Sequence, residues 1–254
     1  MRHTFHLAVR DLRALWRQPW FVAVTLVQPL IWLLLFGELF KSVADLPGFG
    51  HESYIAYLAP GIVVMSALFS SGWSGMATIE EINRGVTDRL LVSPVRRSAL
   101  IAGRVVQSAV VIVVQSVVMV GIALAAGASF DGGVLGVVVL ILVAALLGSA
   151  LAALSNALGL VTRREESLIA AVTFLVLPLT FLSTALMRSD LLPGWMQTAA
   201  ELNPVDWAIE AGRSATAASP DWGQVAGHAA LLVALLAVCG ALATRAFRSY
   251  QASV

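Results

Sequence analysis

The sequence is poor in lysine and cysteine. Lys and Arg together number 16 among 254 residues, and Lys41 is the only lysine. Because Cys239 is the only cysteine, no disulfide can form within the chain. A phosphate-binding loop needs Gly-x-x-x-x-Gly-Lys-[Ser/Thr], and no such glycines precede Lys41. The chain therefore cannot bind ATP through this motif, and any ATP-driven function needs a separate ATPase.

Clusters of catalytic or metal-binding side chains are also missing from the sequence. The histidines are His3, His6, His51 and His228, and no ligand spacing relates them. No Gly-x-Ser-x-Gly motif marks a nucleophilic serine. We therefore expect a non-catalytic chain that holds no metal or cofactor and has no nucleic-acid partner.

Apolar residues dominate what is present. The hydrophobic fraction is 59%, charged residues make up 12%, and mean hydropathy is +0.86, values far from those of a soluble domain. Crossing a hydrocarbon core takes about 20 helical residues, and backbone groups in lipid must bond within the helix. Six stretches are long enough: Trp20–Phe40, Ile55–Ile79, Val105–Ala126, Gly133–Val161, Leu168–Met187 and Val225–Thr244. We predict an all-α integral membrane protein with six transmembrane helices in one domain, 1–254.

The distribution of arginine predicts how these spans are oriented. The first, third, fifth and seventh connecting segments carry thirteen basic residues, whereas the others, with the span boundaries, carry only Lys41, Arg188 and Arg213. Lys and Arg favour cytoplasmic loops, so both termini are expected in the cytoplasm. The excess of arginine over lysine is typical of a high-GC genome. We therefore expect a multi-pass protein of a bacterial plasma membrane.

Residues 1–19 are expected to form an amphipathic helix on the inner membrane surface. Apolar residues at i, i+3, i+4 and i+7 form one face, and a basic stripe lies opposite, which is typical of an interfacial helix in contact with lipid. The candidate surface residues are Arg10, Arg13, Trp16 and Arg17. A disordered basic tail that only sets the topology is the alternative.

The cytoplasmic segment 80–104 is the longest and most charged connection on the inner side. It mixes both charge signs and then carries an apolar patch that includes Leu90 and Leu91, until Pro94 breaks any helix. A short surface helix with charge and an apolar patch suits docking to a soluble partner. A solvated loop fits the periodicity equally well.

The extracytoplasmic segment 188–224 is too long for a simple turn. Two breakers, Pro193 and Pro204, divide it into short helical pieces, and its tryptophans can anchor these pieces at the outer interface. The pieces are either re-entrant half-helices or surface caps, and the sequence does not decide between them.

Small and polar residues recur at helical spacing within the spans, among them a stripe that contains Gly148 and Gly159. We weigh close helix packing above a substrate-facing lining for these stripes. Buried amides are better pathway candidates because leaving one unpaired is costly, although bonding between helices explains them equally well. The candidates for a substrate path are Ser70, Ser74, Gln107, Gln115 and Asn156. No predicted span carries an ionisable residue near its middle, which argues against ion-coupled transport.

Several short motifs, taken together in order and spacing, resemble one family. They are Trp16-Arg17-Gln18-Pro19, Gln28-Pro29 and Leu35-Phe36-Gly37 at the first span; Glu81, Arg84-Gly85, Asp88-Arg89-Leu90-Leu91, Ser93-Pro94, Arg97 and Gly103-Arg104 in the inner segment; and Leu192-Pro193, Trp195, Leu202-Asn203-Pro204 and Arg213 before the last span. On these residues, nearly the whole chain resembles the type-2 ATP-binding-cassette (ABC) exporter permeases, particularly the daunorubicin-resistance-like drug exporters.

This resemblance implies a function that composition alone does not give. Such permeases pair with a second copy or a paralogue, and two ABC ATPase subunits that hold ATP and Mg dock beneath them. Segment 80–104 would be the coupling contact. The residues implied in docking are Glu81, Arg84, Gly85, Asp88, Arg89, Leu90, Leu91, Pro94 and Arg97. Here Ile82 and Asn83 stand where many members carry a further acidic run, so the individual charge contacts differ.

The expected function is therefore the membrane subunit of an ATP-driven exporter that moves an amphipathic drug-like or lipid-like compound outward. Two alternatives stay open at this point. A permease for a lipid-linked polysaccharide or teichoic acid would belong to the same class, whereas an ion-coupled secondary transporter would belong to another.

Overall fold

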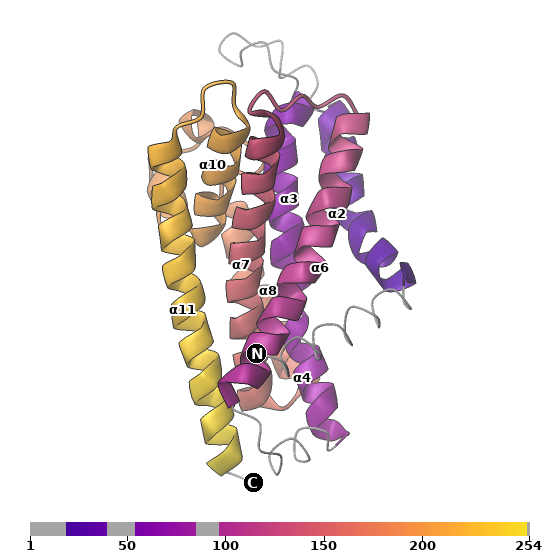
Figure 1. The fold of residues 1–254 in the computed structure, drawn as a ribbon, viewed down its shortest axis with the longest axis vertical. Helices are drawn as coiled ribbons and strands as arrows, with labels where there is room; N and C mark the ends of the chain where they lie inside the picture. Colours follow the sequence, from indigo (N-terminus) through magenta and orange to yellow (C-terminus); the bar gives the residue numbers. More distant parts are fainter. Residues whose placement is uncertain (1–18, 40–53, 85–96, 253–254) are drawn as a thin grey trace.

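The computed structural model describes residues 19–39, 54–84 and 97–252, and all the regular elements in these ranges are helices (Figure 1). This confirms the predicted all-α class. In chain order the elements are α2 (Pro19–Leu39), α3 (Tyr54–Gly72), α4 (Ser74–Asn83), α6 (Arg97–Ala125), α7 (Gly133–Thr162), α8 (Glu165–Phe181), the 3₁₀ turn η2 (Ser189–Leu191), α9 (Gly194–Glu201), α10 (Pro204–Thr216) and α11 (Trp222–Ala252).

Four stretches of the described chain are long and apolar enough to cross a membrane. They are Tyr54–Asn83, Gly103–Ala125, Gly133–Thr162 and Trp222–Tyr250. Each coincides with a predicted span, because a continuous apolar run of this length has no other way to satisfy its backbone in lipid. The first predicted span falls on α2, of which Val27–Leu39 forms a shorter apolar stretch.

Helix α7 lies at the centre of the bundle and packs against α3, α4, α6, α10 and α11 (Figure 1). Its thirty residues give it a length of about 45 Å. Small residues allow its neighbours to come close: a side chain on Gly148 would strike Ile112, and one on Gly159 would lie 2.7 Å from the carbonyl oxygen of Gly75. Close packing is therefore the role of most of this stripe, as expected.

The fifth predicted span, Leu168–Met187, is wrong at its outer end. Helix α8 stops at Phe181, and residues 182–188 are not helical. Seventeen residues give α8 a length of about 26 Å, roughly half the length that α7 and its flanking turns cover. The chain from Leu182 to Arg188 therefore continues outward in a non-helical form alongside α3, where Tyr54 donates to the Leu186 carbonyl at 3.0 Å.

Helix α10 packs inside the bundle, whereas η2 has no buried residue and α9 buries only Ala200. Side chains added to Gly132 or Gly136 at the outer end of α7 would strike the carbonyl of Ala215, and one on Gly212 would strike Leu140. The register is therefore antiparallel, and the thirteen residues of α10 extend about 20 Å down α7. Helix α10 therefore doubles back along α7, a geometry that fits the re-entrant alternative better than a surface cap (Figure 1).

Candidate functional site

A cavity of about 250 Å³ lies toward the predicted cytoplasmic end of the bundle, between α3–α4 and α6, with α7 behind it. It brings together four of the five residues predicted for a substrate path. Hydroxyl, amide and charged groups share its wall with apolar side chains. The lining residues are Ser70, Ser71, Trp73, Ser74, Ala77, Glu81, Arg104, Gln107, Ser108, Val111, Ile112 and Asn156. We call this space the inner cavity.

The fifth candidate, Gln115, does not line the inner cavity. It lies two turns further along α6, and only 2% of its surface is exposed. Its position on the bundle side of α6 fits the packing alternative rather than a pathway. Ser70 and Ser74, by contrast, both line the cavity.

A network of polar side chains forms the inner wall of this cavity. The Arg104 guanidinium on α6 pairs with the Glu81 carboxylate on α4 and donates to the Thr78 hydroxyl. It also donates to Asn156 Oδ1 on α7, at 3.3 Å. Asn156 in turn donates through Nδ2 to Ser74 Oγ at 3.0 Å. One guanidinium therefore ties three helices together, and we call this set the inner cluster.

Arg104 and Glu81 pair with each other, so among the described residues of the cavity wall both charges are compensated. What remains for a ligand is a wall of hydroxyls and amides mixed with the apolar side chains of Val111, Ile112 and Trp73. Ligand sites are typically apolar with a few fixed polar groups. The arrangement therefore suits the edge of an amphipathic molecule that carries hydrogen-bonding groups on one side.

Most of the predicted docking residues lie outside the described chain. Only two of them have described side chains: Glu81 belongs to the inner cluster, and Arg84 pairs with Glu80 one turn earlier on an exposed surface. Arg97 begins α6. The residues outside the described ranges are Gly85, Asp88, Arg89, Leu90, Leu91 and Pro94, together with Arg10, Arg13, Trp16 and Arg17 of the expected interfacial helix.

A second polar cluster lies on the outer half, where α8 ends beside α10. Asn203 connects the two helices. Its Nδ2 donates to the carbonyls of Leu179 at 2.8 Å and Leu182 at 2.7 Å, which the last turn of α8 leaves free, while its Oδ1 accepts from the Val205 amide at 2.9 Å. One side chain therefore caps the end of α8 and the start of α10.

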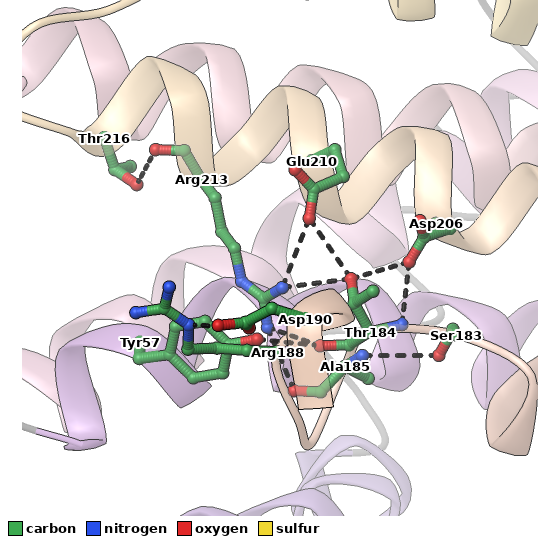
Figure 2. Close-up of polar contacts among 10 residues, drawn as sticks. All are labelled: Tyr57, Ser183, Thr184, Ala185, Arg188, Asp190, Asp206, Glu210, Arg213 and Thr216. Atoms are coloured by element: carbon green, nitrogen blue, oxygen red, sulfur yellow. Dashed lines mark hydrogen bonds and ion pairs between the residues drawn. The ribbon is translucent and has the colours of Figure 1, made fainter. Parts of the chain in front are cut away.

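Arg213 holds the non-helical chain that follows α8 (Figure 2). Its Nη2 donates to the carbonyls of Thr184 at 2.7 Å and Ala185 at 3.2 Å, and its guanidinium stacks 3.8 Å above the Tyr57 ring. Asp206 accepts from the Thr184 amide at 2.7 Å and from its hydroxyl at 2.6 Å. These bonds satisfy backbone groups that a helix would otherwise pair internally. We call this set the outer cluster.

Glu210 completes the outer cluster and faces a second cavity. It accepts from Arg213 Nη1 at 3.4 Å and from Thr184 Oγ1 at 3.2 Å. The cavity is about 370 Å³ in volume and is bordered by α3, by α10 and by the loops on either side. Because the Arg213 head group already contacts two carbonyls, a hydroxyl and a ring, the outer cluster acts as a brace for the chain.

Sequence reasoning did not identify the outer cluster as a unit. The signal was available in part, because Asp206, Glu210 and Arg213 follow one another at steps of four and three residues and so share one helix face. Their partners at Thr184 and Tyr57 are distant in sequence. The prediction that no span carries an ionisable residue near its middle does not cover these residues, because α10 lies between the fifth and sixth predicted spans.

Comparison with known proteins assigns the family. The family described as ABC-2 type transporter matches residues 2–216. A daunorubicin resistance ABC transporter permease, DrrB1 of Streptomyces coeruleorubidus, is 30% identical over 89% of this chain and 79% of its own length. DrrC of Mycobacterium tuberculosis, a probable doxorubicin resistance permease, is 24% identical over 92% of this chain and 84% of its own. The inner membrane transport permease YadH of Escherichia coli is 28% identical over 82% of both.

The chain therefore belongs to the ABC-2 type transporter family. It is a multi-pass membrane permease subunit, and members of this class are non-catalytic transmembrane subunits that work with ABC ATPase subunits. The recognised resemblance is confirmed at this level, and ATP-driven transport takes the place of the ion-coupled alternative.

Proposed function

We propose that this chain is the membrane half of an exporter that uses ATP hydrolysis to move small amphipathic compounds out across the plasma membrane. The chain crosses the membrane six times, through α2, the α3–α4 pair, α6, α7, α8 with the chain that follows it, and α11. Both termini lie in the cytoplasm, which agrees with the arginines at the inner ends of these helices. ATP and Mg belong to the partner ATPase.

The inner cavity is the observation that carries this proposal. It lies toward the predicted cytoplasmic end of the bundle, and it combines hydroxyls and amides with apolar side chains. A molecule that dissolves in the inner leaflet can place a hydrogen-bonding edge on Ser74, Ser108 and Gln107 while its apolar body stays against the helices. The drug-resistance names of two relatives support the same substrate class.

A lipid-linked polysaccharide or teichoic acid is the less favoured substrate. A sugar chain needs a wide passage lined by aromatic side chains. The inner cavity has a volume of about 250 Å³, and among the described residues of its wall Trp73 is the single aromatic one. Drug-sized ligands occupy sites of about 300–1,000 Å³, so this cavity suits part of a small molecule better than a polymer.

The working complex contains two permease chains and two ATPase subunits. Segment 80–104 forms the coupling contact, with Asp88 and Arg89 as charge partners. Reversing both charges should prevent the ATPase from co-purifying while membrane insertion stays intact. Normal co-purification of that double variant would rule out this docking assignment, and reversal of the Arg245 charge on α11 serves as the control.

Transport itself is tested with the chain and its co-purified ATPase in proteoliposomes. We would measure ATP-dependent movement of daunorubicin, and separately of a fluorescent phospholipid, because both are amphipathic. ATP-dependent movement of either probe supports the proposal. Absence of both movements, from a complex that still hydrolyses ATP, would overturn the amphipathic substrate class. Replacing Gln107 with leucine should weaken the transport of an active probe, whereas the same change at Gln197, outside the inner cavity, should not.

A further inference from the structure

The second predicted span is broken where α3 meets α4. Trp73 separates the two helices, and the Met76 amide donates to the Trp73 carbonyl at 3.0 Å instead of to Gly72. The break frees the Gly72 carbonyl and the Gly75 amide in a buried position. Freed backbone groups at such depth need partners from elsewhere in the protein.

Ser155 on α7 supplies both partners. Its hydroxyl donates to the Gly72 carbonyl and accepts from the Gly75 amide at 2.9 Å. A single side chain of another helix thus replaces the bonds that the continuous helix would have made. These bonds converge on one oxygen atom, so α4 can change its angle to α3 while its freed groups keep a partner.

The contact between α4 and α7 at this point is made by backbone. A side chain on Gly75 would strike the backbone of Ser155, and one on Gly159 would strike the backbone of Gly75. Backbone surfaces without interlocking side chains allow the small sliding movements that packed helices make. The break, its bridging hydroxyl and the smooth contact lie together at the end of the inner cavity, where Trp73 and Ser74 line its wall.

Arg104 ties the other end of α4. The Glu81 carboxylate in the last turn of α4 pairs with Arg104, and the Thr78 hydroxyl one turn earlier accepts a hydrogen bond from Arg104. Arg104 stands near the inner end of α6, while α4 leads at Asn83 into the segment expected to meet the ATPase. Both flanks of that segment are therefore joined by one guanidinium, which also reaches Asn156 on α7.

We infer that α4 is a lever that changes its angle to α3 at Trp73 and so opens and closes the inner cavity. Ser155 keeps the freed backbone groups at this hinge bonded, and Arg104 connects the other end of α4 to α6 and α7. Ser155, Arg104 and Glu81 are positioning residues in this account: they transmit movement of the ATPase-facing segment to the wall of the cavity. The inference rests on the proposed function, because it needs a substrate in the cavity and an ATPase beneath it.

A reversible lock tests the lever. Ser74 Oγ and Ser108 Oγ are 3.4 Å apart across the cavity, so cysteines at these positions can be joined by oxidation, or by a short reducible bis-methanethiosulfonate bridge. The native thiol is removed by Cys239→Ser. In the complex with its ATPase, the joined protein should lose transport about tenfold or more and recover it on reduction. Full transport by the joined protein would overturn the lever.

Two controls keep the result specific. The single variants Ser74→Cys and Ser108→Cys, given the same oxidant or bridging reagent, should each transport at the rate of their own untreated sample and keep their bound ATPase. Arg104→Gln should lower the number of molecules moved per ATP about fivefold, whereas Arg245→Gln, an exposed arginine at the inner end of α11, should leave that ratio unchanged. An unchanged ratio in Arg104→Gln would contradict the tie.

The two proposals fail in different ways. If the unmodified complex moves no amphipathic probe, the proposed substrate class is wrong. If the unmodified complex moves a probe and the locked complex moves it equally well, the exporter assignment stands and the lever is wrong.

Discussion

The inner and outer clusters both place an arginine between helices, but the two arginines have different surroundings. The Arg213 side chain is 14% exposed, and it binds backbone carbonyls of the non-helical chain that follows α8. Arg104 is 25% exposed at its side chain and binds only side chains. The first arrangement completes the fold, whereas the second can be rearranged without leaving backbone groups unpaired.

The position of each cluster follows the same division. The outer cluster joins α10 to the non-helical chain that follows the end of α8. The inner cluster borders a cavity and adjoins the break at Trp73. This comparison teaches that polar groups between membrane helices have two uses here: a brace on the outer side and a movable tie on the inner side.

The largest effect on stability is expected from Arg213→Ala. Removing one partner of a buried charged network costs about 3–5 kcal/mol, because the carbonyls of Thr184 and Ala185 and the Glu210 carboxylate each lose a charged donor. Thermal unfolding of the detergent-purified protein measures this. Arg104→Ala should cost less, about 1–3 kcal/mol, since water can reach the Glu81 carboxylate and the variant leaves no backbone group without its donor. Equal losses in the two variants would abolish the distinction between brace and tie.

Packing between α4 and α7 gives the next effect. Gly159→Ala places a methyl group against the Gly75 backbone, and overpacking of this kind costs about 1–3 kcal/mol. Gly121→Ala on α6 is the matched control, because a side chain there meets nothing within 4 Å. Unfolding temperatures of the two variants should therefore separate clearly, and a stable Gly159→Ala protein would refute the close backbone contact.

A smaller loss is expected from Asn203→Ala on the outer side. The variant loses the cap of α10, worth about 1–2 kcal/mol, and leaves two carbonyls at the end of α8 without their donor. Thr198→Ala on α9 is the comparison, since its hydroxyl bonds only within an exposed turn. The measurement is again thermal unfolding, and it would argue against the double cap if the two variants were equally stable.

The smallest effect is expected from Arg84→Ala. Arg84 and Glu80 form an exposed pair one turn apart, and such pairs contribute about 0.3–0.5 kcal/mol. Stability should therefore stay close to that of the unmodified protein. Binding of the ATPase is a separate readout from stability. If this variant still bound its ATPase fully, the implied docking role of Arg84 would be wrong.

The sequence predicted the helices that depend only on the residues within them. A continuous apolar run fixes a spanning helix, so four predicted spans coincide with helices of the structure. The break at Trp73 escaped prediction because Gly72, Trp73 and Ser74 keep the run apolar enough, and the bonds that stabilise the break come from Ser155, 80 residues or more away.

The same reasoning explains the outer half. Residues 182–188 remain within the apolar window of the fifth span, so composition alone extends the helix to Met187. The helix ends at Phe181 because Asn203, Asp206 and Arg213 take over its backbone bonds. Four of the five path candidates line one cavity, because polar residues on three predicted spans converge there. Their pairing with Arg104 depends on tertiary contacts that spacing does not reveal.

The most direct test of the brace and the tie is a pair of distance measurements by electron paramagnetic resonance in a Cys239→Ser background. Spin labels at Glu80 on α4 and Val161 on α7 report the inner side, and labels at Leu202 and Val134 report the outer side; all four positions are exposed. In the complex with its ATPase, addition of a non-hydrolysable ATP analogue should change the inner distance and leave the outer distance unchanged. An unchanged inner distance, or an outer distance that changes with it, would contradict the account.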